Sequence, residues 1–381
     1  MDWQNIDTPF YYYDTALLQQ TLDTICHEIR QYPNYRVHYA LKANVNPKIL
    51  SIIQQAGLGA DCVSRGEIET AIQAGFPANK ILFAGVGKTD KEIILALHQE
   101  ILCFNVESVE ELHIINQLAH QENKIASVCF RINPDVEADT HKYIRTGLAE
   151  DKFGIDWNRT IEVIQLAQTM PNIHFKGLHF HIGSQITNMD DFMQLCFRIN
   201  ALQEQLDDHG LRAEMINVGG GLGVDYHQPK QNPIPDFHAY FQTFATYLQL
   251  REGQTLHFEL GRSIVAQCGT LITRVLYVKQ GVNKQFVIVD AGMTELIRPA
   301  LYDAHHAVEN ITSTLPTREI YDVVGPICES SDVFDKDLQL PTTQRGDLLA
   351  IRSAGAYGET MASCYNCRPL PNSYTDKEQP I

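Results

Sequence analysis

VHYAL, residues 37–41, is the first of eight short runs that are rich in β-branched or aromatic residues and that decide the fold. The other seven runs span 60–63, 81–84, 102–106, 127–132, 175–181, 215–218 and 256–260. Between them lie longer stretches such as 66–74 and 89–98, with apolar residues at steps of three and four, the spacing of amphipathic helices. Eight strands that alternate with helices predict an α/β fold, a closed parallel (β/α)8 barrel, with a doubly wound open sheet as the structural alternative.

The pattern changes after Arg262. Strand-like runs at 272–278, 286–290, 320–324 and 347–351 are joined by turns without long helices, and 10–13 is one more strand candidate. The sequence therefore predicts two domains: a barrel over 30–268, and a mainly antiparallel β domain built from 1–29 and 269–381. The tail, 372–381, is polar, and we expect no closing strand in it.

Composition excludes several classes of partner. The 381 residues include 30 Lys and Arg against 46 Asp and Glu, a formal charge of −16, whereas nucleic acid and anionic membranes require a positive surface. The N-terminus lacks the pattern of a secretory signal, and no run reaches the ~18 apolar residues of a membrane span. Nine cysteines without framework spacing are typical of reduced thiols in a cytoplasmic protein. The pair Cys364 and Cys367 has no second pair or nearby histidine, so we expect no metal there.

The carboxyl ends of barrel strands are where the chemistry of this fold lies. The residues at those positions are Lys42, Asp61, Arg131, His179, His181, Gly219, Gly220, Gly221, Glu259 and Arg262. Taken singly, each has a structural explanation: a lysine is usually a solvated cap, a buried histidine a hydrogen-bonded core residue, and a glycine run a tight turn. Taken together, they supply the parts that hold a phosphorylated, cationic aromatic ring.

Each part has a chemical reason. A glycine segment, 219–223, opening a helix would present unobstructed N–H groups to a phosphate, and Ser184 could add a hydroxyl donor. Glu259 would keep a pyridine nitrogen protonated, and the imidazole of His181 would stack on the ring. Lys42 would be the amine that bonds to an aldehyde.

These motifs resemble the fold-type III, alanine-racemase-like decarboxylases that use pyridoxal phosphate. YALKAN (39–44), HIGSQ (181–185), GGGLG (219–223) and ELGR (259–262) follow the order of that family. RINPD (131–135), KFGI (152–155), RPALY (298–302), CES (328–330) and GAYG (355–358) are more specifically similar to the diaminopimelate decarboxylases. The resemblance covers roughly residues 8 to 370, and Leu260 stands where the family usually has proline.

The resemblance implies pyridoxal 5′-phosphate as cofactor and a homodimer with shared active sites. It implies decarboxylation of an amino acid, meso-2,6-diaminopimelate, to L-lysine and carbon dioxide, the last step of lysine biosynthesis. Lys42 and Cys328 are the implied catalytic residues, Cys328 as proton donor. The implied cofactor contacts are Lys42, His181, Ser184, Gly219, Gly220, Gly221, Glu259, Gly261, Arg262 and Tyr357. The implied substrate contacts are Arg262, Arg298, Tyr302, Glu329 and Tyr357.

Other functions fit part of the pattern. Another basic amino-acid decarboxylase of the same fold, of the carboxynorspermidine or diamine type, would have no need of Arg298. An alanine-racemase-like enzyme would need a tyrosine base in place of Cys328 and Glu329. A non-catalytic pyridoxal-phosphate carrier resembles the barrel alone, and a phosphate-binding aldolase barrel leaves the Cys-Glu pair unexplained.

Overall fold

All eight strands expected between residues 37 and 260 are present in the computed structural model, which describes residues 3–134, 152–316 and 318–377. The chain forms two compact units. Unit 1 comprises Met1–Thr21, Val224–Pro235 and Arg262–Ile381; unit 2 comprises Leu22–Gly223 and Asp236–Gly261. Each unit has its own sheet and its own hydrophobic core. Asp135, the last residue of the RINPD motif, lies outside the described residues.

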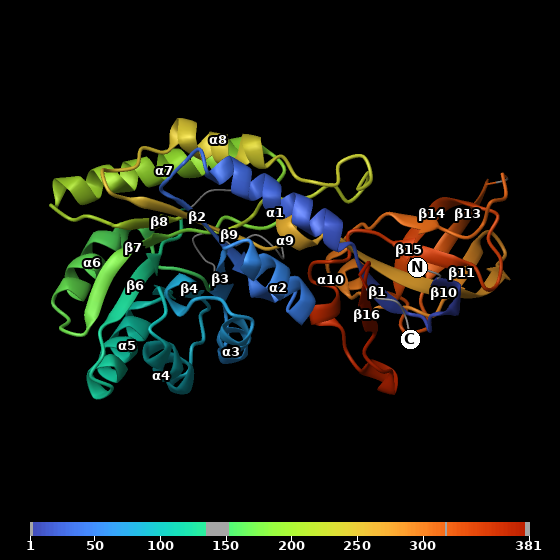
Figure 1. Cartoon of the computed structure of the whole chain (residues 1–381), viewed down its shortest axis with the longest axis horizontal. Helices are drawn as coiled ribbons and strands as arrows, with labels where there is room; N and C mark the ends of the chain where they lie inside the picture. Colours follow the sequence, from blue (N-terminus) through green and yellow to red (C-terminus); the bar gives the residue numbers. More distant parts are fainter. Residues whose placement is uncertain (1–2, 135–151, 317, 378–381) are drawn as a thin grey trace. The chain divides into compact units, whose positions relative to one another are not determined.

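Unit 2 is a closed parallel barrel, as predicted (Figure 1). Its strands are β2 (Tyr35–Ala40), β3 (Gly59–Cys62), β4 (Ile81–Phe83), β5 (Cys103–Val106), β6 (Ala126–Arg131), β7 (Ile173–His179), β8 (Met215–Asn217) and β9 (Thr255–Leu260). The helices that follow them are α2 (Pro47–Gln55), α3 (Arg65–Gln73), α4 (Asp90–Gln99), α5 (Val109–Gln121), α6 (Thr160–Gln168), α7 (Met189–Asp208) and α8 (Phe237–Tyr247). The pairing of β2 with β9 closes the ring, so the alternative of an open sheet is wrong.

The local sequence explains where these helices begin. Ser64 and Ser108 are N-caps whose side chains accept hydrogen bonds from the N–H groups of Glu67 and Glu111. Thr89 opens α4 with a capping box that it shares with Glu92. Because each cap comes shortly after a strand, the connections at the carboxyl end of the barrel are short and their side chains are fixed in direction.

The barrel interior is filled by side chains from neighbouring strands. Leu82, Cys103, Cys129 and Met215 form one buried cluster inside the ring. Outside it, the rings of Phe192, Tyr240, Phe244 and Phe258 pack edge to face and join α7 and α8 to β9. Burial of such apolar area stabilises the fold by about 25 cal/mol per Å².

Unit 1 is a mainly antiparallel sheet, also as predicted. The strands are β1 (Phe10–Tyr13), β10 (Gly269–Gln280), β11 (Gln285–Val289), β12 (Val308–Asn310), β13 (Arg318–Val324), β14 (Val333–Pro341), β15 (Leu348–Ile351) and β16 (Asn372–Thr375). They follow the order β12-β15-β10-β11-β13-β14, with β1 paired to β10 and β16. Two short helices, α9 (Arg262–Val265) and α10 (Arg298–Tyr302), belong to this unit, and α1 (Thr15–Ile29) crosses from unit 1 into unit 2 at residues 21 and 22.

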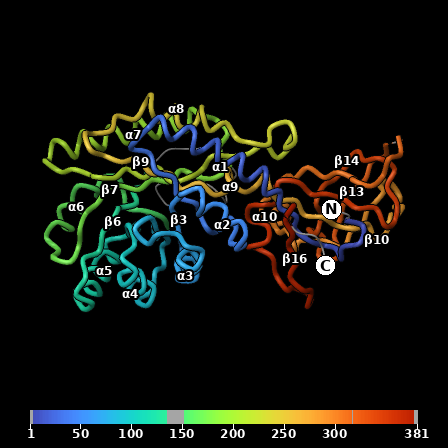
Figure 2. Tube along the Cα trace, viewed as in Figure 1, coloured from blue at the N-terminus to red at the C-terminus, as the bar shows by residue number. Residues whose placement is uncertain are grey.

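The expectation that the polar tail has no closing strand is wrong. Asn372–Thr375 forms β16, which pairs in parallel with β1, so strands from the two ends of the chain lie side by side (Figure 2). The ring of Tyr374 packs edge to face on Phe10, with 5.4 Å between the centroids. The partner strand and one aromatic contact therefore stabilise a segment whose own composition does not indicate a strand.

No helix in the described part of the chain is both long enough and apolar enough to cross a bilayer.

Candidate active site

Lys42 lies at the carboxyl end of β2, in a short 3-10 helix, Leu41–Ala43. Its side chain is exposed, while Leu41 and Ala43 on either side are buried. The buried neighbours fix the backbone, so the amine is presented at the mouth of the barrel where the family motif requires it.

Glu259, near the end of β9, is a buried carboxylate held by three donors. Oε1 accepts hydrogen bonds from Nδ2 of Asn105 (2.9 Å) and Nδ2 of Asn217 (2.7 Å), and Oε2 accepts one from Nε2 of His179 (3.0 Å). Burial alone would raise the pKa of Glu259, but His179, followed by His181 and Lys42, outweighs it, and the net pKa lies well below the usual value. The group is therefore a permanent anion inside the barrel mouth.

Asp61, at the end of β3, has the opposite environment. Burial and then the negative charge of Glu259 raise the pKa of Asp61 well above its usual value, although Lys42 lowers it. Its Oδ1 is buried without a hydrogen-bond partner among the described residues. Two carboxyl groups whose pKa values are driven apart, beside an amine, are typical of acid–base chemistry.

The glycine segment after β8 forms a cradle. A Cβ on Gly219 would collide with the carbonyl oxygen of Phe180, and one on Gly220 with that of Glu259. Gly219 and Gly221 also have positive φ values of 68° and 114°, which side chains rarely adopt. Only glycine therefore fits all three positions, and the backbone is left open to a phosphate-sized group.

One detail of the sequence interpretation is wrong: these glycines do not open a helix. The next helix, α8, begins at Phe237, and the intervening segment Val224–Pro235 belongs to unit 1. The chain leaves the barrel directly after Gly223, so the cradle is made of turn backbone and not of a helix terminus.

His181 and Ser184 follow β7 and are half-buried beside the cradle. The N–H of Gly220 donates to Nδ1 of His181 over 3.4 Å. Burial, and then the positive charges of Arg131 and Lys42, lower the pKa of His181 well below its usual value. A neutral imidazole with Nδ1 as acceptor is thus set at the rim of the cradle. Gly261 lies just past β9, where a Cβ would approach those of Ala40 and Ala43 to 3.1 Å.

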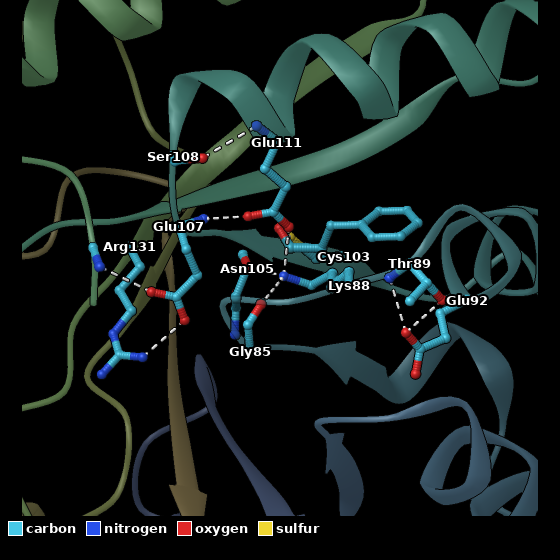
Figure 3. A network of polar contacts seen from close by, with 12 residues as sticks. Gly85, Lys88, Thr89, Glu92, Cys103, Asn105, Glu107, Ser108, Glu111 and Arg131 are labelled. Carbon is cyan, nitrogen blue, oxygen red and sulfur yellow. Dashed lines mark hydrogen bonds and ion pairs between the residues drawn. The ribbon is translucent and has the colours of Figure 1, made fainter. Parts of the chain in front are cut away.

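Arg131 is the end of a buried ionic network that Figure 3 shows from close by. Its Nη1 donates to Oε1 of Glu107 (2.8 Å), and Oε2 of Glu107 accepts the N–H of Gly154 (2.9 Å). The N–H of Glu107 donates to Glu111, whose other oxygen accepts from Nζ of Lys88 at 2.6 Å. The network fixes the direction of Arg131, whose positive charge adds to burial in lowering the pKa of His181.

In unit 1, two guanidinium groups share one phenol. Nη1 of Arg262, in α9, donates to the hydroxyl of Tyr226 (2.7 Å), and Nη1 of Arg298, in α10, donates to the same oxygen (3.0 Å). Burial would raise the pKa of Tyr226, but the two guanidinium groups outweigh it and lower the pKa. Arg262 also lies over the ring of Tyr357, 5.0 Å from its centroid. The structure therefore brings together three of the predicted residues and adds Tyr226.

Arg298 has a second neutral partner. Nη1 donates to Nε2 of His306 (2.8 Å), and Nδ1 of His306 donates to the carbonyl oxygen of Arg352 (2.8 Å), which fixes the tautomer. Burial, followed by the charge of Arg298, lowers the pKa of His306 to about 3. Arg298 is 5% exposed, and it has no carboxylate partner within the described ranges. A buried cation held only by neutral groups is typical of a site built for an anionic ligand.

Cys328 and Glu329 lie in an exposed turn between β13 and β14 of unit 1. The turn is fixed by Asp332, whose carboxylate accepts the N–H groups of Ile327 (2.7 Å) and Met293 (2.6 Å). The carboxylate of Glu329 accepts a hydrogen bond from the hydroxyl of Tyr365 (2.9 Å). Tyr302 is at the end of α10.

Comparison with known proteins identifies the family. The family described as pyridoxal-dependent decarboxylase, pyridoxal binding domain, matches residues 21–266. A diaminopimelate decarboxylase of Bacteroides thetaiotaomicron is 62% identical over 376 residues, which cover 99% of this chain and 97% of that protein. The chain belongs to the diaminopimelate decarboxylases, a family of pyridoxal-dependent decarboxylases.

Solved structures of the family agree with the fold. The diaminopimelate decarboxylase of Helicobacter pylori, in complex with L-lysine, is 41% identical, with a TM-score of 0.92 over 99% of this chain and 93% of that one. The enzyme of M. jannaschii, also in complex with L-lysine, is 34% identical, with a TM-score of 0.90 over 98% and 89% of the two chains.

The residues in the barrel mouth fit pyridoxal phosphate. The glycine cradle suits a phosphate, the buried anion of Glu259 suits a protonated ring nitrogen, and the amine of Lys42 suits an aldehyde. Nδ1 of His179 and Oδ1 of Asp61 are buried polar atoms without a hydrogen-bond partner among the described residues, as expected of a site that a polar ligand completes.

Sequence reasoning missed the supporting residues. Tyr226, His306 and Asp332 orient the predicted residues, yet none belongs to a motif that was singled out. Asn105 is the penultimate residue of β5 and Asn217 the last residue of β8, and this position at the carboxyl ends of barrel strands is the signal that could have identified them.

Proposed function

We infer that this protein is a pyridoxal-phosphate-dependent carboxy-lyase that converts meso-2,6-diaminopimelate to L-lysine and carbon dioxide, the last step of lysine biosynthesis. The observation that carries the substrate assignment is Arg298, a buried guanidinium whose partners among the described residues are neutral. Diaminopimelate has a second carboxylate that ornithine, arginine and lysine lack, and a guanidinium is the side chain that recognises it best.

Three residues of the barrel, Lys42, His181 and Glu259, have different roles toward the cofactor. When bound, pyridoxal phosphate supplies the sink for the electron pair that carbon dioxide leaves behind. Glu259 holds a proton on the ring nitrogen, because its pKa is too low for it to take that proton itself. Lys42 would hold the cofactor through its amine, and neutral His181 would support the face of the ring.

The phosphate is bound by the cradle of Gly219, Gly220 and Gly221, with Ser184 and Gly261 beside it. Arg262 and Tyr357, which contact one another, serve both the cofactor and the substrate. Tyr302 and Glu329 complete the substrate contacts, Glu329 by offering a carboxylate to the distal ammonium.

Cys328 returns the proton to the carbon atom that has lost carbon dioxide, and it does so in the barrel of a partner chain in a homodimer. Two observations support this proposal. The Cys328 turn is exposed on unit 1, and Asp332 holds it rigid, as a group that must reach another subunit would be. A two-fold interface would exclude water from the carbanion and produce two equivalent sites.

The cytoplasm is the proposed location. All nine cysteines are free thiols, which suits a reducing compartment.

The deciding experiment measures carbon dioxide release from meso-diaminopimelate, L-lysine, L-ornithine and L-arginine by the purified holoenzyme. We expect meso-diaminopimelate to be preferred by roughly 10⁴-fold in kcat/KM, because a site built for a polar group rejects analogues that lack it. Borohydride reduction and peptide mapping of the same preparation should place the pyridoxyl group on Lys42. Comparable turnover of ornithine would contradict the substrate, and a label on another lysine would contradict the role of Lys42.

A further inference from the structure

A cavity of about 420 Å³ lies in unit 2 at the amino-terminal end of the barrel strands. Its lining includes the first residues of β2, β3 and β9, namely Tyr35, Gly59 and Thr255. Lys42 and Glu259 lie at the other end of these strands. At about 3.3 Å per residue, six-residue strands separate the two ends by roughly 17 Å. The cavity is therefore distinct from the candidate active site.

The walls of this cavity are apolar. Ile29, Val37, Leu58 and Leu102 line it, together with the ring of Tyr35. Its volume falls within the range of pockets that bind small organic molecules, which is about 300–1,000 Å³. An apolar cavity of this size accommodates a flat ring system.

The charged residues of the lining are all basic. They are Arg36, Lys80 and Lys176, and no Asp or Glu is among the described residues that line the cavity, although the chain has a net charge of −16. Arg36 donates only to the backbone carbonyls of Pro33 and Tyr35, and Lys80 only to that of Gly57, so both cations lack an ion-pair partner within the described ranges. Lys176 has a distant carboxylate, Glu214, at 3.9 Å.

The two histidines of the lining, His38 and His257, find hydrogen-bond partners within the protein. Nδ1 of His38 faces the carbonyl oxygen of Lys80 at 3.1 Å, so it must carry the proton, and Nε2 is an acceptor. Nδ1 of His257 therefore donates to Nε2 of His38 over 2.8 Å, and Nε2 of His257 accepts from the hydroxyl of Thr255 over 3.0 Å. Burial lowers the pKa of both histidines, that of His38 to about 4, in agreement with this neutral chain. The positive charge is thus confined to the three basic side chains.

We propose that this cavity is a second ligand site, which binds a small organic anion with an aromatic body between the apolar walls and its acidic group on Arg36 and Lys80. The substrate and the product do not suit it, because their ammonium groups would find no carboxylate in the lining. The proposal does not depend on the reaction that the other end of the barrel catalyses.

The test titrates the holoenzyme with 8-anilinonaphthalene-1-sulfonate and, separately, with the uncharged N-phenyl-1-naphthylamine, and follows fluorescence. We expect saturable one-site binding of the sulfonate. The double variant Arg36→Ala/Lys80→Ala should weaken it by roughly 10-fold or more, because charge-assisted hydrogen bonds are lost, while binding of the uncharged probe stays unchanged. Ala56→Trp, which places an indole in the lining, should abolish binding of both probes. The matched control, Lys91→Ala/Arg159→Ala, removes two exposed cations elsewhere on unit 2 and should bind as the wild type does.

Circular dichroism and retained decarboxylase activity establish that each variant is folded. Arg36→Ala/Lys80→Ala changes exposed side chains only, so this variant tests the proposal even if Ala56→Trp does not fold. Equal sulfonate affinity in the wild type and in Arg36→Ala/Lys80→Ala would overturn the proposal. Absence of one-site binding to the wild-type holoenzyme would overturn it as well. Loss of probe binding as protein concentration rises, with a larger species in light scattering, would assign the cavity to a second copy of the chain instead.

Discussion

At the residue scale, we propose that the guanidinium of Arg298 decides which substrate is accepted. It is buried and donates to Tyr226 and His306, both neutral, so we expect the substrate to supply the counter-charge. We predict that Arg298→Met lowers kcat/KM for meso-diaminopimelate by roughly 10²–10³-fold, because a buried charge pair is lost. The absorbance of the bound cofactor should remain. Arg345→Met, at an exposed arginine of the same unit, is the matched control. A variant that keeps wild-type kcat/KM would show that Arg298 does not contact the substrate.

His306 makes the stability of unit 1 sensitive to acid. Burial and the charge of Arg298 lower its pKa from 6.5 to about 3. Between these two values the unfolded chain binds a proton that the folded chain refuses, so stability rises with pH and is lost as pH falls below 6.5. Through this one group, the free energy of unfolding should fall by about 1.5 kcal/mol between pH 6.5 and pH 5.

Urea denaturation at pH 6.5 and pH 5 measures this effect. Over this interval, His306→Gln should lose about 1.5 kcal/mol less free energy of unfolding than the wild type does. The control His209→Gln, at the exposed end of α7, should retain the wild-type difference. If His306→Gln and the wild type lose the same free energy of unfolding between pH 6.5 and pH 5, His306 is already charged in the folded protein.

The sequence could predict residues that carry chemistry but not those that orient them. Lys42 and Glu259 were identifiable as candidates because a barrel places its chemistry at strand ends and because family motifs surround them. Tyr226 could not be predicted, because its role comes from two arginines that are 36 and 72 residues away in the chain. A tyrosine in a polar loop has no periodicity or spacing that indicates such a partnership.

At the scale of elements, Lys88 joins three segments of the barrel. Its Nζ donates to the carbonyl oxygens of Gly85 and Asn105, both at 2.8 Å, and to Glu111 of α5, so all three protons are used (Figure 3). The side chain is 1% exposed. We predict that Lys88→Met lowers the free energy of unfolding by about 3–5 kcal/mol, because the buried carboxylate of Glu111 is left without a counter-charge.

Denaturant midpoints check this prediction. Lys91→Met, at an exposed lysine in α4, is the control and should change stability little. The double variant Lys88→Met/Glu111→Gln should be more stable than Lys88→Met alone, because it removes the unpaired charge. If Lys88→Met behaves as Lys91→Met does, the network is dispensable for stability.

Element prediction was most accurate where pattern and burial agree. Barrel strands are buried on both faces, so short apolar runs indicated all eight. β12, β14 and β16 were missed: β12 has only three residues, β14 contains the charged run Asp335, Lys336 and Asp337, and β16 is a polar four-residue strand. β12 and β16 depend on pairing with strands that are far away in the chain, β15 and β1, which no local window reveals.

At the scale of the whole molecule, the chain passes between its two units more than once. Val224–Pro235 leaves the barrel after the glycine cradle, and this excursion places Tyr226 in unit 1 with Arg262 and Arg298. The change in secondary-structure pattern after Arg262 indicated two domains, but the sequence contained no sign of an insertion of this kind. The boundaries expected from sequence, 30–268 for the barrel, stay a prediction that limited proteolysis can test.

The proposed homodimer with shared sites predicts complementation between inactive variants. Lys42→Ala removes the amine and Cys328→Ala the proton donor, so each variant alone should be nearly inactive in decarboxylation. In a mixed dimer, one barrel combines an intact Lys42 with the partner's intact Cys328, and the other barrel carries both lesions. An equimolar mixture after complete subunit exchange contains half mixed dimers, and each has one functional site of two. Activity should therefore return to about a quarter of the wild-type value.

A second mixture separates the alternatives. Wild type mixed with the double variant Lys42→Ala/Cys328→Ala produces mixed dimers without any intact shared site, so about a quarter of the wild-type activity should remain. If Cys328 served its own barrel, every wild-type chain would stay active and about half would remain. Exchange is confirmed independently by differently tagged subunits and native mass spectrometry. With exchange established, no recovery in the first mixture together with half activity in the second would show that the proton donor acts within its own chain, and the shared site would be wrong.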